Sequence, residues 1–67
     1  PMEYLRRKVN PNGEISILHT GIYLSASLAG WEVGLKPASE GRYMVWFGPL
    51  CLGHIDLETE SFNVLPS

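Results

Sequence analysis

Glycine and proline interrupt this 67-residue chain so often that long regular elements have no room to form. Seven glycines and five prolines are spread along it at short intervals. Both residue types are poorly tolerated inside helices and strands, because glycine loses much conformational freedom and proline lacks a backbone donor. No segment of ten or more residues shows helical periodicity. The sequence therefore predicts short strands joined by tight turns.

Segments rich in β-branched and aromatic residues lie between these interruptions, which is typical of strands. Residues 25–30 differ, since Ser25 can cap a helical turn and Gly30 can end it, so we expect one short helical or 3-10 turn there. Five to seven short strands in a chain of this length predict an all-β fold, a small closed or half-open antiparallel barrel. The expected strands are residues 3–10, 14–20, 22–25, 31–38, 42–48, 50–57 and 62–65.

The length of the chain limits it to one small domain, residues 1–67. A domain of this size buries only about 60% of the surface of its unfolded chain, so its stability is marginal. Cys51 is the only cysteine, so no disulfide can form within the chain. A lone cysteine fits a reducing cytoplasm or a buried structural thiol. No apolar run approaches the roughly 20 residues that span a bilayer, and we expect a soluble, cytoplasmic protein without a membrane partner.

No catalytic or metal-binding pattern is visible in the sequence. The acidic residues at 56–60 lack the glycine and the spacing of a calcium loop. One cysteine, Cys51, and two histidines, His19 and His54, with no Cys-x-x-Cys pair, argue against a zinc site. There is no glycine-rich phosphate loop and no nucleophile elbow. We therefore expect a chain that is not an enzyme, with no cofactor, no metal and no small-molecule substrate.

Basic residues interleaved with aromatic residues favour a nucleic-acid partner. Strand alternation would send Arg7 to one face and Arg6 and Lys8 to the other. Cations of this kind neutralise phosphates while aromatic rings pack on sugars or bases. The formal net charge of −2 argues against strong autonomous binding, and three cations on an edge strand can also serve to block aggregation. The candidate DNA-contacting residues are Arg6, Arg7, Lys8, Lys36 and Arg42.

Residues 45–56 form the most apolar stretch of the chain, broken by Gly48-Pro49 and by Gly53. The pattern predicts a hairpin that closes the barrel, with Gly48-Pro49 as its turn and Gly53 as a bend or a close backbone approach. We expect Phe47 and Ile55 to lie in the core. Large side chains on the opposite face would pack against DNA or a neighbouring subunit. The candidate interface residues are Trp31, Met44 and Trp46.

Residues 24–35 read Leu-Ser-x-x-Leu-Ala-Gly-x-x-Val-Gly-Leu, and residues 52–56 read Leu-Gly-His-Ile-Asp. Together with the segment 6–17, which fits a first hairpin, this pattern resembles the C-terminal domain of integrase-core (DDE) transposases encoded by bacterial insertion sequences. The resemblance extends from residue 6 to residue 56. It implies a small SH3-like barrel that follows a catalytic domain of RNase H-like fold.

In such transposases the barrel helps to bind the DNA ends of the element and to assemble the multimer for DNA integration and recombination. The catalytic Asp, Asp, Glu set lies in the other domain, so no catalytic residue carries over to this chain. We expect weak binding of duplex DNA, mostly through phosphates, by the C-terminal piece of a longer transposase. The alternatives are a barrel that forms homo-oligomers through Met44 and Trp46, and a stand-alone remnant.

Overall fold

Seven antiparallel strands and one 3-10 turn make up the protein in the computed structural model, which describes residues 5–65. The first expected strand began at residue 3, and residues 3 and 4 lie outside the described residues. The elements are β1 (Leu5–Lys8), β2 (Glu14–Ile17), β3 (Thr20–Tyr23), η1 (Ala26–Leu28), β4 (Glu32–Ser39), β5 (Arg42–Phe47), β6 (Leu50–Asp56) and β7 (Ser61–Val64).

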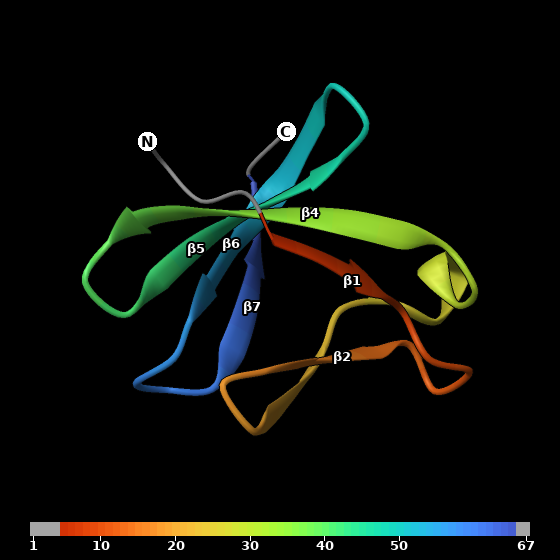
Figure 1. Ribbon diagram of the computed structural model, residues 1–67, viewed down its shortest axis with the longest axis horizontal. Helices are drawn as coiled ribbons and strands as arrows, with labels where there is room; N and C mark the ends of the chain where they lie inside the picture. The colour runs from red at the N-terminus through yellow and green to blue at the C-terminus, as the bar shows by residue number, and fades with distance from the viewer. Residues whose placement is uncertain (1–4, 66–67) are drawn as a thin grey trace.

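The strands form two sheets that face each other. Five of them are ordered β1-β4-β5-β6-β7, while β2 and β3 pair only with each other. The β2–β3 hairpin lies below the larger sheet in Figure 1. The fold is thus all-β, as predicted, and is compatible with a small SH3-like barrel, although β1 and β7 do not pair to close it. No helix within residues 5–65 has the length and apolar character needed to cross a membrane.

The core fills the space between the two sheets. Strand alternation turns every second residue of β4, β5 and β6 toward the hairpin, and the hairpin contributes isoleucines from the opposite side. We call the side of the five-stranded sheet that faces the hairpin the inner face, and the other side the outer face. The buried core residues are Val9, Ile15, Ile17, Ile22, Leu24, Val33, Leu35, Val45 and Ile55.

The hairpin expected within residues 6–17 is wrong, because β1 pairs with β4 and not with β2. Backbone hydrogen bonds continue beyond the end of β1 and join the residue after β1 to the residues before β4. The Val9 amide donates to the Trp31 carbonyl at 2.8 Å, and the Gly30 amide donates to the Val9 carbonyl at 2.9 Å. The chain then turns a corner, where the side-chain oxygen of Asn10 accepts hydrogen bonds from the backbone amides of Asn12 and Glu14.

The turn of the β2–β3 hairpin divides the strand expected at residues 14–20. Ile17 pairs with Thr20, so Leu18 and His19 are the two turn residues. Both have positive φ, 49° and 67°. Two-residue hairpins favour this conformation at both positions because it matches the twist of the strands, but only Gly, Asn and Asp adopt it at low cost. This turn is therefore built from residues that are strained in it.

Replacing Leu18-His19 with Asn-Gly is expected to stabilise the fold by about 1 kcal/mol, because it removes this strain. Urea denaturation followed by circular dichroism measures the change. The matched control is Leu18→Ala with His19→Ala, which removes the same side chains but leaves two L-residues at positive φ. An equal gain in stability in both double variants would show that the unfavourable energy comes from the two side chains and not from the backbone conformation.

The β5–β6 hairpin turns at Gly48-Pro49, as predicted. Phe47 pairs with Leu50 and Gly48 has φ 58°, which suits the first position of a two-residue turn. Ile55 is fully buried, which confirms the prediction for that residue. The prediction for Phe47 is wrong, since its side chain is only half-buried. A register shift after Val45 bends the hairpin, and Phe47 lies beyond it, at the far end of β5.

Candidate functional site

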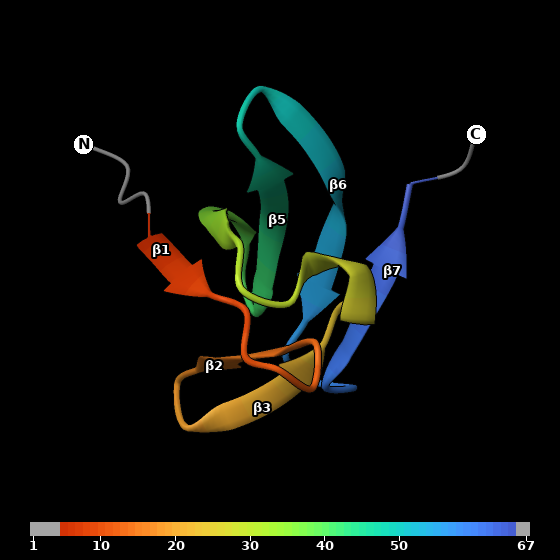
Figure 2. The same ribbon diagram turned by 90° about the vertical axis from the view of Figure 1, so that its right-hand side faces the viewer.

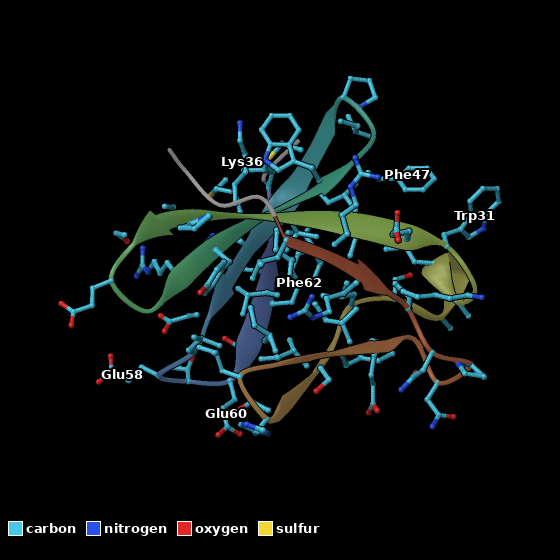
Figure 3. All side chains as sticks on the ribbon, viewed as in Figure 1. Trp31, Lys36, Phe47, Glu58, Glu60 and Phe62 are labelled. Carbon is cyan, nitrogen blue, oxygen red and sulfur yellow. The ribbon has the colours of Figure 1, made fainter. Side chains whose placement is uncertain are left out.

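Four cations lie on the outer face of the five-stranded sheet. Residues paired across neighbouring strands share a face. The pairs Arg6–Gly34 and Lys36–Met44 are both on the outer face, since Leu35 and Val45 between them are buried in the core. Figure 3 shows Lys36 on the side of β4 away from the β2–β3 hairpin. The four outer-face cations are Arg6, Lys8, Lys36 and Arg42.

Arg7, the fifth predicted DNA-contacting residue, turns the other way. Its Nε donates to the Ser16 carbonyl at 3.0 Å, and its Nη1 donates to the Arg6 carbonyl at 2.8 Å. The side chain is half-buried and links β1 to the β2–β3 hairpin. The alternation expected for Arg6, Arg7 and Lys8 is thus present, and it removes Arg7 from the surface that holds the other four.

Two of the outer-face cations face carboxylates at the edge of ion-pair range. The Arg6 Nη1 lies 3.7 Å from the Glu32 carboxylate, and the Arg42 Nη2 lies 3.7 Å from the Asp56 carboxylate. Both arginine side chains are more than half exposed, at 68% and 53%. The Glu32 carboxylate is also exposed, at 57%, and such an exposed pair contributes roughly 0 to 1 kcal/mol. Arg6 can therefore exchange Glu32 for a phosphate at little cost. Asp56 is only 19% exposed, so its pair with Arg42 is partly buried.

The predicted interface residues Met44 and Trp46 lie between these cations on the outer face, and both are half-buried. Lys36 partly covers the indole, with its Nζ 5.5 Å from the centroid of the Trp46 ring, a cation–π contact. Cys51 of β6 pairs with Trp46 and is also half-buried. The outer face is thus a cationic surface around a small apolar centre.

Trp31, the third predicted interface residue, lies apart from this centre. It directly precedes β4, is 58% exposed, and contacts the Phe47 ring edge-to-face with the centroids 5.7 Å apart. Figure 3 places the Trp31–Phe47 pair together at the far end of β4 from the Lys36 side chain. The structure therefore brings together two of the three predicted interface residues.

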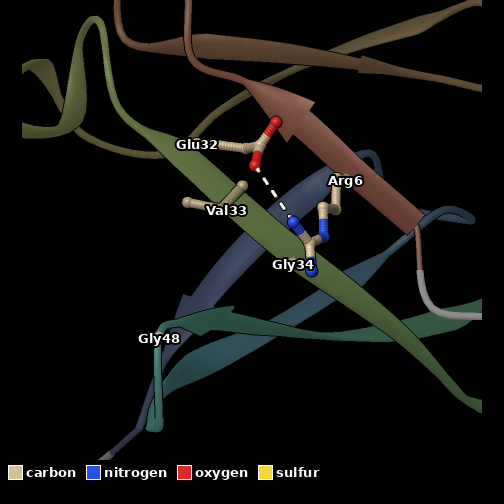
Figure 4. A pocket seen from close by; sticks show the side chains of 5 residues that line it. All are labelled: Arg6, Glu32, Val33, Gly34 and Gly48. Carbon is tan, nitrogen blue, oxygen red and sulfur yellow. Dashed lines mark ion pairs between the residues drawn. The ribbon is translucent and has the colours of Figure 1, made fainter.

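A cleft of about 220 Å³ opens beside Arg6, with Glu32 on its wall. Figure 4 shows the two side chains reaching toward each other from β1 and β4. Gly34 contributes no side chain to the cleft, and Gly48 of the β5–β6 turn also lines it. Because one cation and one carboxylate share this small space, the cleft itself has little net charge.

Among the described residues, the outer face carries an excess of positive charge. The outer face holds four cations and two carboxylates, Glu32 and Asp56, although the whole chain has a net charge of −2. Figure 3 shows Glu58 and Glu60 in the β6–β7 turn, on the opposite side of the molecule from Lys36. This excess of positive charge on one face is not apparent from the net charge of the chain. It results from strand alternation in β1, β4 and β5.

Within residues 5–65, no three His, Cys, Asp or Glu side chains come together as a metal ion would require. Comparisons of the chain with protein-family models, with curated proteins and with solved structures found no significant match.

Proposed function

We propose that this chain is a non-catalytic domain that binds duplex DNA through its phosphates and belongs to a transposase or integrase. The observation that carries the DNA-binding part is the presence of four cations on one face of the sheet, in a protein whose total charge is negative. The resemblance of residues 6–56 to the transposase C-terminal domain supports the second part. We propose that the parent protein performs the cleavage and joining reactions with residues of another domain.

The chemistry of the outer face fits contacts to the DNA backbone. Arg6 and Arg42 can each offer two parallel N–H groups to one phosphate in place of the carboxylate that each faces. Lys36 presents a compact charge beside the Trp46 ring. Contacts to phosphates fix the position of a protein on the duplex but do not read its sequence. Any choice of DNA sequence must then come from another part of the parent protein.

Titration of a fluorescent duplex, followed by anisotropy, tests this proposal. At ~50 mM salt we expect a dissociation constant below roughly 10⁻⁴ M, because non-specific binding lies at roughly 10⁻⁴ to 10⁻⁶ M at physiological salt and tightens as the salt is lowered. Four phosphate contacts predict that binding weakens about 100-fold when the salt is raised to ~200 mM. Absence of binding at ~50 mM salt, with several hundred micromolar protein, would contradict autonomous DNA binding.

Self-association is a second candidate function. The apolar side chain of Val64 is 72% exposed and lines an apolar groove between the 3-10 turn and β6–β7. An exposed apolar surface on a small domain can mark a contact with another protein. Val64 pairs with Gly53 and shares the inner face with Val45, whereas Met44 and Trp46, the predicted self-association residues, lie on the outer face.

A further inference from the structure

Strand β7 is the last strand of the five-stranded sheet, and the edge that faces away from β6 pairs with no other described strand, although β3 lies close to β7. The Leu65 amide donates to the Leu52 carbonyl at 3.0 Å. Hydrogen bonds alternate along an antiparallel strand, so Ser61 and Asn63 also face β6, whereas the backbone groups of Phe62 and Val64 face away from it. No hydrogen-bond partner for these backbone groups is found within residues 5–65. Figure 2 shows β7 at the outer edge of the sheet, opposite β1.

An apolar groove of about 360 Å³ lies beside this edge. It runs between the 3-10 turn and β6–β7, and its lining contains no charged residue. Val64 lies at its rim with 72% of the residue exposed. The edge therefore offers backbone hydrogen bonds and a groove for a side chain at the same place, which are the two requirements for adding an extended strand. The groove is lined by Leu24, Ser25, Ser27, Leu28, Leu52, Phe62 and Val64.

The two edges of the five-stranded sheet differ in charge. The β1 edge carries the exposed cations Arg6 and Lys8, which oppose pairing with a second β1 edge. Residues 61–65 contain no charged residue. Two copies of β7 can thus meet without charge repulsion.

We propose that the β7 edge binds the β7 edge of a second copy of this chain, in antiparallel orientation. Phe62 of one copy would then face Val64 of the other, and the two-fold axis would pass between the two Asn63 residues. In this register the outward backbone groups of Phe62 and Val64 satisfy each other across the interface. Each exposed Val64 side chain comes to lie against the groove beside Phe62 of the other copy. The hydrogen-bonding pattern of this strand, which matches its own antiparallel copy, and its lack of charge are the reasons to assign a second copy to the edge.

This inference deepens the second candidate function and does not depend on DNA binding. A two-fold axis perpendicular to the paired sheets leaves the outer faces of both copies on the same side. The interface is small, so the association is expected to be weak and reversible. Sedimentation equilibrium of the 67-residue chain, at concentrations up to ~1 mM, measures it.

The decisive variant is Val64→Lys, which places a charge at the pairing edge and should raise the dissociation constant of the dimer at least tenfold. Val64 is 72% exposed, so a lysine there should leave the monomer folded, and circular dichroism verifies this. Leu50→Lys is the matched control, because Leu50 is a similarly exposed apolar residue, at 59%, in the β5–β6 hairpin. We expect Leu50→Lys to dimerise like the parent chain.

A parent chain that stays monomeric at ~1 mM would overturn the proposal, and so would a Val64→Lys variant that dimerises as well as the parent. Equal loss in Leu50→Lys and Val64→Lys would place the contact elsewhere. Hydrogen exchange adds an independent readout, since the amides of Phe62 and Val64 should become protected as the concentration rises. None of these measurements contains DNA, so failure of the dimer and failure of DNA binding remain separate results.

Discussion

Replacing Gly53 with alanine is expected to lower the free energy of unfolding by about 3 kcal/mol, the upper range for overpacking in a well-packed interior. A β-carbon at this position would overlap the carbonyl oxygen of Asn63 and lie 3.0 Å from its carbonyl carbon. Both atoms belong to the backbone of β7, which is held by its pairing with β6. Neither strand can move away without losing that pairing, so the protein cannot relieve the clash by rotating a side chain.

The total stability of a domain of this length is roughly 3 to 10 kcal/mol, so this loss would leave a large unfolded population. Gly21→Ala is the matched control, because no atom lies within 4 Å of a β-carbon there. We expect that variant to be unchanged or slightly more stable, by about 0.5 kcal/mol, since alanine restricts the unfolded chain. Urea denaturation followed by tryptophan fluorescence compares the two. Equal stability of both variants would contradict the close approach of β6 and β7.

The second large effect concerns DNA. The double variant Lys36→Glu, Arg42→Glu is expected to bind a duplex at least 100-fold more weakly at ~50 mM salt, because it converts two phosphate contacts into two repulsions. Both side chains are exposed, but the change at Arg42 places a carboxylate beside the mostly buried Asp56, so circular dichroism must verify that the variant is folded. The variant also loses the contact of Lys36 with the Trp46 ring, which costs roughly 0.5 to 1 kcal/mol of stability.

A charge reversal on the opposite side of the protein distinguishes the effect of the outer-face charge on DNA binding from the effect of the total charge. Glu58→Lys with Glu60→Lys changes the net charge by the same amount in the other direction, in the β6–β7 turn. If the outer face binds DNA, this control should alter the affinity by only a few-fold, through long-range attraction that salt screens. If total charge governs binding, the two double variants should shift the affinity by similar factors in opposite directions.

Most strand positions could be predicted because β-branched and aromatic residues mark the strands, turn signals such as Gly48-Pro49 separate several of them, and alternation marks their faces. The β5–β6 hairpin and the burial of Ile55 followed from these local signals. The turn at Leu18-His19 could not be predicted, since neither residue prefers positive φ and the pairing of Ile17 with Thr20 imposes it. The incomplete burial of Phe47 depends on the register shift after Val45, which leaves no local signal in the sequence.

The candidate site was only partly predictable, because its assembly also depends on pairing between strands that are distant in the sequence. The sequence identified all four outer-face cations, and alternation correctly separated Arg7 from Arg6 and Lys8. Their arrangement on one surface with Lys36 requires that β1 pair with β4, a contact between segments far apart in the chain. A hairpin within residues 6–17, the locally simpler pairing, would have placed these cations differently. The free edge of β7 likewise depends on the order of strands in the complete sheet.

The salt dependence of DNA binding tests the proposed function of the outer face most directly. The slope of the logarithm of the association constant against the logarithm of the salt concentration reports the number of phosphates neutralised. Four contacts predict a slope of about −3.6 for the parent chain, and the neutral variant Lys36→Ala, Arg42→Ala should reduce it to about −1.8. A parent slope near zero, or an unchanged slope in the variant, would contradict phosphate binding by this face.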